Sequence, residues 1–519
     1  MDTSNRNKIS VLNALSAIML TLTNGLLGII ATKMIIHQYG SDFNGLNSTA
    51  NQLINVLLIV EGGFTLASNV ALFSPLTHQE YRKVNGLLYE TQRKFRKIGV
   101  LFLSLGIMAS LFFALFANST LQFELIFGVI IMAVIPAAFN LYYATTYRVL
   151  LQAQQKEYII NIFTMITIAI GHIGNIGLIV INGTVWLVRA ITMITTLLNS
   201  LLIVWHVKKH NRFLDLNAGN NGEVIHGTWD VMVQKVTGVI YLSAPIIFLA
   251  VSSEGGTVLA SVYAVYNNVF NVIKSLLRSV IDAPRLGIGQ MLTETDHKKI
   301  WNVFAEYEYI VLGFTFIICS TTYVLIMPFI SMYTNGMSDV NYYDKKIALL
   351  MTLISIFEII HIPSGHLINM SGKFKISKYI QINSLIILTL CIFILGGQWG
   401  IYGLLYAVLI VAILLAVLEI GYIHILFFSS KIIELVRMLL PFLLAGIGVC
   451  YYEEKIFTNI EGIKGFILYG IFLTVINTIT AVIISMIFNK KITSEIYQRV
   501  LKLAIEYKIE RSGKNNVDI

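Results

Sequence analysis

The chain has 519 residues, of which 56% are hydrophobic and only 13% are charged. Soluble domains carry about 25% charged residues, and the mean hydropathy of +0.74 adds to the contrast, so a water-soluble fold is excluded. The formal charge of +9 does not indicate a nucleic-acid-binding protein, because the excess lies in short connections between apolar runs and in the C-terminal tail.

Apolar runs recur along the whole chain, and a helix of about 20 such residues crosses the roughly 30 Å hydrocarbon core of a bilayer. The segment MDTSNRNKIS before the first run is too polar to begin a signal peptide, so we expect this first span to remain in the protein. The sequence therefore predicts an all-α integral membrane protein of about fourteen spans. The predicted spans are 11–36, 44–73, 97–118, 122–151, 158–181, 184–207, 228–252, 257–284, 304–332, 345–370, 378–398, 401–427, 434–452 and 465–488.

Lysine and arginine residues alternate from one connection to the next. Most of the 37 fall in every second connection and in the tail, whereas the connections between them hold few. Because positively charged connections stay on the cytoplasmic side, both termini are predicted to be cytoplasmic, and an even number of spans follows.

Two blocks of six spans resemble diverged copies of each other. The segment that starts at His37 (HQYGSDFNGLN) aligns with the segment at Ser252, and LLQAQQKEY at Leu150 aligns with LINMSGKFK at Leu367, with nearly the same offset. Parallel six-helix repeats are a transporter architecture with the substrate site between the halves. The predicted divisions are a first half at 1–210, a second half at 211–430, two further spans at 431–488, and a basic amphipathic tail on the cytoplasmic leaflet at 489–519.

Polar side chains form stripes on two predicted helices that correspond under this repeat. On the span 257–284 the stripe covers about 80° of the helix surface, and on the span 44–73 it covers about 120°. We expect the two stripes to face each other across a polar lumen. The first stripe contains Asn267, Asn271, Lys274, Arg278, Asp282 and Arg285, and the second contains Asn47, Asn51, Asn55, Glu61, Thr65 and Asn69.

Ionisable residues inside spans are candidates for function, because a charge at the bilayer centre costs about 2.5 to 3.5 kcal/mol. The candidate cations for a substrate-binding lumen are Lys274, Arg278, Lys235, Lys33 and Arg189. Snorkelling of these long side chains to the membrane interface is the alternative. The acids Glu61, Asp282, Glu358 and Glu419 are candidates for pairing with these cations or for carrying coupling protons, and pairing is favoured.

Histidines occur in two further polar positions, His172 near Asn175 and His361 near His366. A metal site or proton relay is one interpretation, but interhelical hydrogen bonding is favoured because no acid or cysteine stands at ligand spacing. No metal, cofactor or catalytic residue is predicted. The chain has no phosphate-binding loop motif, so any energy for transport would come from a proton or sodium gradient or from a partner.

The motifs YGSDFNGLN, VEGGF, LLQAQQKEY and LINMSGKFK, within twelve helices plus two, resemble bacterial polysaccharide flippases of the multidrug, oligosaccharidyl-lipid and polysaccharide exporter (MOP) superfamily. The resemblance covers nearly the whole chain and implies a multi-pass protein of the bacterial cytoplasmic membrane. It also implies transport of undecaprenyl-pyrophosphate-linked oligosaccharide to the outer leaflet for O-antigen or capsule, by alternating access, with a polysaccharide polymerase as a partner. A cation-lined lumen would suit such an anionic cargo.

Three alternatives stay open. A lipid II flippase shares the fourteen-helix plan and a cationic cavity. A multidrug/cation antiporter usually has twelve helices and acidic ion sites, and a membrane polymerase or ligase needs a large outer loop, which this chain lacks. The flippase is therefore preferred and an enzyme is not expected.

Overall fold

The computed structural model describes residues 3–216, 229–252, 256–282, 292, 297–456, 460 and 462–499. These residues form helices without a strand, and ten helical segments among them are long and apolar enough to cross a membrane. Two of these segments, of 50 and 54 residues, are long enough for two crossings each. The protein is thus an all-α, multi-pass membrane protein, and each of the fourteen predicted spans coincides with a helix or a helix pair within the described ranges.

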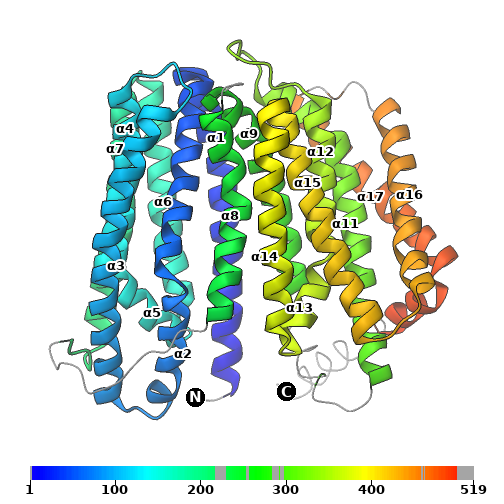
Figure 1. The fold of residues 1–519 in the computed structure, drawn as a ribbon, viewed down its shortest axis with the longest axis horizontal. Coiled ribbons are helices and arrows are strands. Elements are labelled where there is room, and N and C mark those ends of the chain that lie inside the picture. Colours follow the sequence, from blue (N-terminus) through cyan, green and yellow to red (C-terminus); the bar gives the residue numbers. More distant parts are fainter. Residues whose placement is uncertain are drawn as a thin grey trace, which may run out of the picture. The chain divides into compact units, whose positions relative to one another are not determined.

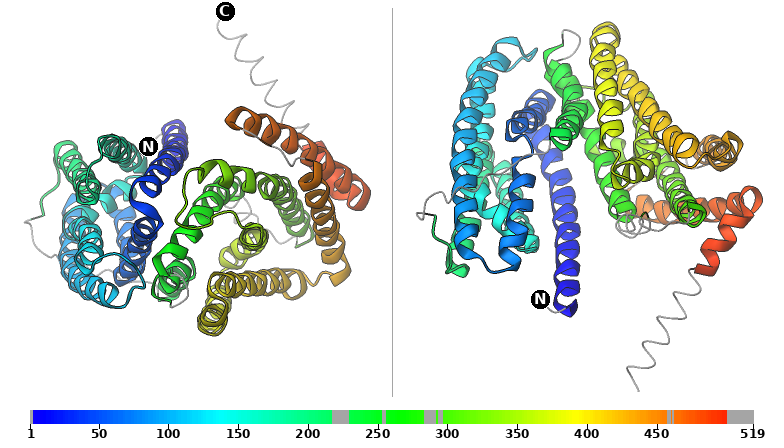
Figure 2. Two further views of the ribbon diagram at one scale, coloured as in Figure 1. Left: turned by 90° about the horizontal axis from the view of Figure 1, so that it is seen from above. Right: turned by 60° about the horizontal axis from the view of Figure 1, so that its bottom comes forward.

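The chain divides into two compact units by its internal contacts (Figures 1 and 2). Unit 1 consists of Met1–Val272, Thr334–Tyr342 and Gln381–Val408, and unit 2 consists of Ile273–Tyr333, Tyr343–Ile380 and Leu409–Ile519. Contacts group helices that pack together, whether or not they arose as copies. The prediction of two halves, two added helices and a tail therefore stays a prediction.

Unit 1 is a bundle in which α1 packs on α6, α3 packs on α4, and α7 packs on both α4 and α6. Its elements are α1 (Thr3–Leu57), η1 (Leu58–Glu61), α2 (Phe64–Thr77), α3 (Tyr81–Phe116), α4 (Phe123–Phe139), η2 (Asn140–Ala144), α5 (Thr145–Ala153), α6 (Glu157–Val180), α7 (Val185–His210) and α8 (Trp229–Val251), the first part of α9 (Gly256–Asp282), the last part of α14 (Phe374–Cys391), η3 (Ile392–Gly396) and the first part of α15 (Gly397–Gly421).

Helix α1 contains the first predicted span and residues 44–57 of the second, and η1 and α2 complete the second span. Gly40 has a φ of 83°, a conformation that glycine adopts without strain, and it interrupts the helix. The amide of Ser41 after this break donates to a carboxylate oxygen of Asp339 at 2.6 Å, so the side chain caps the second helix. The YGSDF motif therefore marks the joint between the two spans.

The second part of α1 lies tightly against the start of α9. A Cβ atom on Gly45 would lie 1.6 Å from the carbonyl oxygen of Thr257, so only glycine fits there. The Asn44 amide donates to Ser261 Oγ at 2.7 Å, and the Asp42 carboxylate accepts from the hydroxyl of Thr257. Asp42 and Thr257 are corresponding positions under the repeat alignment.

Unit 2 is built around α11 (His297–Tyr333), which packs on α12 (Lys345–Ile360), α13 (Ile362–Met370), α16 (Ile432–Ile456) and α17 (Gly462–Phe488). It also contains the end of α9, the start of α14, the end of α15 and η4 (Tyr422–Phe427), which is a π-helix. Pro363 lacks an amide hydrogen and stands at the start of α13, so the predicted span 345–370 is broken at His361. This break positions several polar side chains described below.

The tail begins as a helix at residues 490–499. Ile492 and Ile496 pack against a hydrophobic cluster of unit 2, and Arg499 forms an ion pair with Glu306 at 3.1 Å. The described part of the tail therefore packs on protein with its apolar side. Residues 500–519 of the predicted amphipathic segment lie outside the described residues.

Candidate functional site

A cavity of about 240 Å³ lies inside unit 1, between α1, α4 and α7. Its apolar wall comes mainly from α4, which brings Met132 and Pro136, and its polar wall comes from α1 and α7. The polar side chains are Asn51, Asn55, Arg189, Thr192 and Thr196. Asn51 and Asn55 are exposed, so the cavity is open on the side of α1. Part of the polar stripe on 44–73 therefore faces the interior of unit 1.

Arg189 is the charged residue of this cavity and is only 6% exposed. Its guanidinium donates to the side-chain oxygen of Asn47 and, at 3.3 Å, to the carbonyl oxygen of Val129. The Nε–H group has no hydrogen-bond partner among the described atoms. Both observed partners are neutral, and the ion pairs of the described residues do not include Arg189. A buried cation of this kind favours an anion in the adjoining space.

The volume limits what the cavity can hold. Water occupies about 30 Å³ per molecule in the liquid, so the space corresponds to about eight waters. It is below the roughly 300 to 1,000 Å³ of typical small-molecule sites. The cavity can thus take one anionic group or one sugar ring, with threonine and asparagine side chains available for hydroxyl groups. It cannot enclose a larger lipid-linked molecule.

Helix irregularities lie next to the cavity. Pro136 of α4 lines it, and α4 then continues into the π-helix η2. Thr145 Oγ1 donates to the carbonyl oxygen of Asn140 at 2.9 Å and so satisfies a backbone group of this segment. Such π-helical turns are frequent at functional sites, because they redirect side chains on an otherwise regular helix.

Two of the five predicted cations have acidic partners. Lys235 lies 3.3 Å from the Glu61 carboxylate within unit 1, and the lysine side chain is 42% exposed. Lys274 lies 2.7 Å from the Glu358 carboxylate within unit 2, and both side chains are almost fully buried. An anionic substrate would have to compete with Glu61 and Glu358 for these two lysines. Their role in substrate binding stays a prediction.

The remaining predicted residues are not among those that line the cavity of unit 1. Lys33 is half-buried on α1, and Arg278 is exposed on α9. Asp282 lies 3.2 Å from His366, and Glu419 lies 2.8 Å from His361, so both acids contact histidines of unit 2. His172 contacts Asn24 on a neighbouring helix at 3.5 Å. No three His, Cys, Asp or Glu side chains of the described ranges converge as metal ligands.

Two buried polar residues of unit 2 were missed by the sequence analysis. Glu308 and His424 are 2.7 Å apart, and their side chains are 1% and 2% exposed. Glu308 stands inside the predicted span 304–332, so the rule that flags intramembrane acids would have found it. The same rule applies to His424 in the predicted span 401–427, but the pairing of the two residues could not be found in this way, because 116 positions separate them.

Comparison with solved structures places this architecture among known folds. No family model matches the chain, and no curated protein matches it in sequence. The structure of the lipid II flippase MurJ in an inward closed conformation superposes with a TM-score of 0.64 at 14% identity, over 92% of this chain and 99% of MurJ. The chain has the fold of the MOP superfamily.

Other structures with this fold include a multidrug resistance MATE family transporter of the MOP superfamily in an inward-facing conformation, with a TM-score of 0.62 and 12% identity over 80% of this chain and 99% of that one. A MOP superfamily transporter from Pyrococcus furiosus has a TM-score of 0.55 and 12% identity over 82% and 97% of the two chains. At identities this low the superpositions show a shared fold alone, so the cargo must be inferred from the residues of this chain.

Proposed function

We propose that this chain is a transporter that moves an undecaprenyl-pyrophosphate-linked oligosaccharide from the cytoplasmic to the outer leaflet, for a surface polysaccharide such as O-antigen or capsule. The observation that carries the proposal is Arg189, a buried guanidinium with neutral partners and a free Nε–H beside a polar cavity. A phosphate or an acidic sugar would supply the missing anion, and the neighbouring amides and hydroxyls suit sugar hydroxyl groups. The cavity would engage one group of the cargo while the lipid stays in the bilayer.

The polarity of the site separates this proposal from drug export. For the MOP superfamily transporter from Pyrococcus furiosus, a reverse polarity of the binding pocket suggests a different function. In the present chain the charged group of the cavity is a cation, which would repel cationic drugs and attract an anion. We infer an anionic cargo from this sign.

The extent of the chain also favours a lipid-linked cargo. The MATE family structures match 80–82% of it, whereas MurJ matches 92%. The difference is similar in size to the segment from α16 to α17, residues 432–488. The flippase interpretation requires two helices in addition to twelve, and α16 and α17 supply them.

The proposed setting is a bacterial cytoplasmic membrane with both termini on the cytoplasmic side. A polysaccharide polymerase on the outer face would use the product. Transport would proceed by alternating access, in which the site opens first to one side of the membrane and then to the other.

The proposal is tested by measuring surface polymer in cells that carry Arg189→Met in place of the natural gene. We expect about a 10- to 100-fold loss, because the substitution removes charged hydrogen bonds to the cargo. Arg189→Lys should restore part of the polymer. Arg148→Met removes a half-buried guanidinium that does not line the cavity, and it should leave the polymer intact. Membrane protein levels must be equal in all strains.

Two results would contradict the proposal. Normal polymer in the Arg189→Met strain would exclude the cationic site, and normal polymer after deletion of the gene would exclude the function. Lipid-linked oligosaccharide should accumulate in the deletion strain, because synthesis continues on the inner leaflet while the transfer stops.

A lipid II flippase is the second candidate, and the 92% coverage by MurJ is the observation that favours it. Lipid II is also an anionic, lipid-linked sugar, so the cavity alone does not distinguish the two cargoes. Expression of the chain in cells depleted of their lipid II flippase separates them. Survival of these cells would assign lipid II as the cargo, and lysis agrees with the polysaccharide assignment.

A further inference from the structure

The break between α12 and α13 brings polar side chains of unit 2 together. The segment HIPSGH carries His361, Ser364 and His366, and each of them contacts a carboxylate from a different helix. His361 lies 2.8 Å from Glu419 of α15, Ser364 donates to Glu308 of α11 at 3.3 Å, and His366 lies 3.2 Å from Asp282 of α9. A Cβ atom on Gly365 would lie 2.6 Å from a Glu419 oxygen, so glycine permits this close approach.

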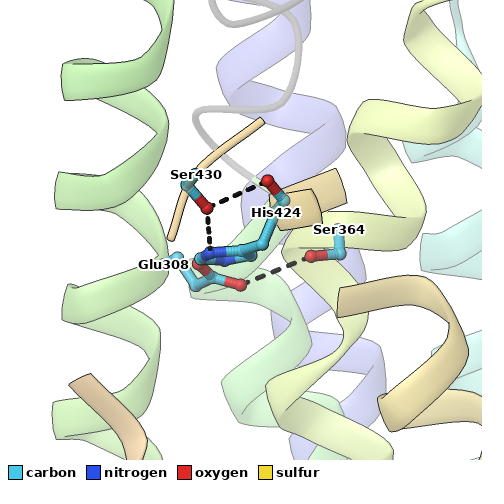
Figure 3. A network of polar contacts seen from close by, with 4 residues as sticks. All are labelled: Glu308, Ser364, His424 and Ser430. Carbon is cyan, nitrogen blue, oxygen red and sulfur yellow. Dashed lines mark hydrogen bonds and ion pairs between the residues drawn. The ribbon is translucent and has the colours of Figure 1, made fainter. Parts of the chain in front are cut away.

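The most buried part of this network is the pair formed by Glu308 and His424 (Figure 3). His424 Nε2 lies 2.7 Å from one oxygen of the Glu308 carboxylate, and Ser364 donates to the other oxygen. Ser430 Oγ lies 3.5 Å from His424 Nδ1 and donates to the carbonyl oxygen of the same residue at 2.9 Å. Every polar atom of the two side chains thus faces a hydrogen-bonding group.

The imidazole of His424 is enclosed by aromatic rings. The ring of Trp301 lies 5.2 Å away with an interplanar angle of 89°, and Phe304 lies 6.4 Å away. Phe428 stacks on Phe304 and contacts Trp301. Aromatic rings and a carboxylate both stabilise an imidazolium. The aromatic rings also exclude the water that would stabilise a carboxylate without a charged partner.

Other charged groups near the pair have partners of their own. The hydroxyl group of Tyr307 also contacts Nδ1 of His366 at 3.4 Å. Among the titratable and charged groups on the elements packed around the pair, those that form an ion pair or hydrogen bond include Lys274 and Asp282 on α9, Glu306 and Tyr307 on α11, Glu358 on α12, His361 and His366 at the break, Glu419 on α15, and Arg499 on the tail helix.

We propose that the Glu308–His424 pair is a proton-binding site that couples a proton gradient to the movement of unit 2. The inference rests on the proposed transport function, for which it supplies the driving ion. With the imidazole protonated to an imidazolium the pair is neutral overall, and loss of that proton leaves a neutral imidazole beside a buried carboxylate charge. A divalent metal would need three or four ligands, and no three His, Cys, Asp or Glu side chains of the described part converge in this way.

The position of the pair links proton binding to the backbone. His424 stands in the π-helix η4, and Ser364 stands shortly after the break at His361. Both hydrogen-bond partners of the Glu308 carboxylate therefore lie where helices are irregular. Loss of the proton would leave a negative charge that the closed, aromatic surroundings do not solvate. Release therefore requires these segments to separate and admit water. In each cycle one proton binds from one side of the membrane and leaves to the other.

Trp301 offers a direct test of proton binding, because a protonated imidazole quenches the fluorescence of a neighbouring indole. The chain has five tryptophans, and the test protein keeps Trp301 while the other four are replaced by phenylalanine. In the full-length protein in lipid nanodiscs, we expect fluorescence to fall in a single one-proton transition as the pH is lowered. Neither substrate nor transport is needed for this measurement.

Variants assign the transition to the pair. His424→Gln should abolish it, and Glu308→Gln should move its midpoint to lower pH by about one unit or more, because the imidazolium loses its counter-ion. His206→Gln, which changes a histidine of unit 1, should leave it unchanged. If His424→Gln does not fold, the shift in Glu308→Gln decides the assignment. Absence of a transition in the parent protein, or the same transition in a folded His424→Gln or Glu308→Gln protein, would overturn the proposal.

A second measurement tests coupling. Proteoliposomes that contain the full chain and an internal pH-sensitive dye should show proton entry when an external acid pulse and the lipid-linked substrate fraction are supplied. Entry should fall at least about tenfold in Glu308→Gln, and equal entry in this variant would overturn the coupling role. An intact fluorescence transition beside normal polymer in the Arg189→Met strain would refute the cargo site alone, so the two proposals fail separately.

Discussion

The buried charged side chains of the two units have different kinds of partners. In unit 1 the guanidinium of Arg189 is held by an asparagine side chain and a backbone carbonyl group, beside an open cavity. In unit 2 the buried ammonium of Lys274 meets the carboxylate of Glu358, and buried carboxylates meet histidines. A charge with neutral partners keeps its affinity for a ligand, whereas a paired charge mainly supports structure or binds protons.

This comparison predicts different responses to removal of a single charge. The largest loss of stability should follow substitution within a buried pair, because the remaining partner becomes an uncompensated charge. The loss should be smaller for a charge held by neutral groups, and smallest for an exposed pair.

The buried pair of unit 2 should show the largest effect. Lys274→Met leaves the Glu358 carboxylate without its ammonium partner, and we expect unfolding to become easier by about 3 to 5 kcal/mol. The double variant Lys274→Met with Glu358→Met should recover most of this loss, because both charges are then absent. Thermal unfolding of the purified protein in detergent measures both. A double variant as unstable as the single one would show that the pair is not the source of the effect.

Arg189→Met should have an intermediate effect on stability and a large effect on transport. The substitution removes hydrogen bonds to neutral groups, each worth about 1.5 to 3 kcal/mol when one partner is charged. It also removes the desolvation penalty of a buried charge, which offsets part of this loss. We expect a net change below about 2 kcal/mol together with the loss of surface polymer. A stability loss equal to that of Lys274→Met would break the comparison between the units.

The exposed pair of unit 1 should show the smallest effect. Lys235 lies 3.3 Å from Glu61, but its side chain is 42% exposed, so water screens the attraction. Lys235→Gln should change the free energy of unfolding by less than about 1 kcal/mol. A larger change would mean that Glu61 depends on this lysine. Substitution of Glu61 tests that dependence separately, because its carboxylate also accepts from the amide of Thr65 at the start of α2.

Several features of the site could be predicted from the sequence. Arg189 and Lys274 stand within apolar runs, and the energetic penalty of such positions identified them as candidates. The sequence could not show that one has neutral partners and the other an acidic one. Glu308 carries the same signal and was overlooked, and its pairing with His424 depends on the meeting of α11 and η4.

The sequence by itself determined that the chain is helical, crosses a membrane many times and has spans at the positions found. This information is local, since each run of about 20 apolar residues favours insertion as a helix whatever the rest of the chain does. Only the tertiary structure decided which charges are paired and which one borders a cavity. Lys274 and Glu358 are 84 positions apart, and Arg189 and Asn47 are 142 apart. Contacts over such separations follow from helix packing, which no local pattern contains.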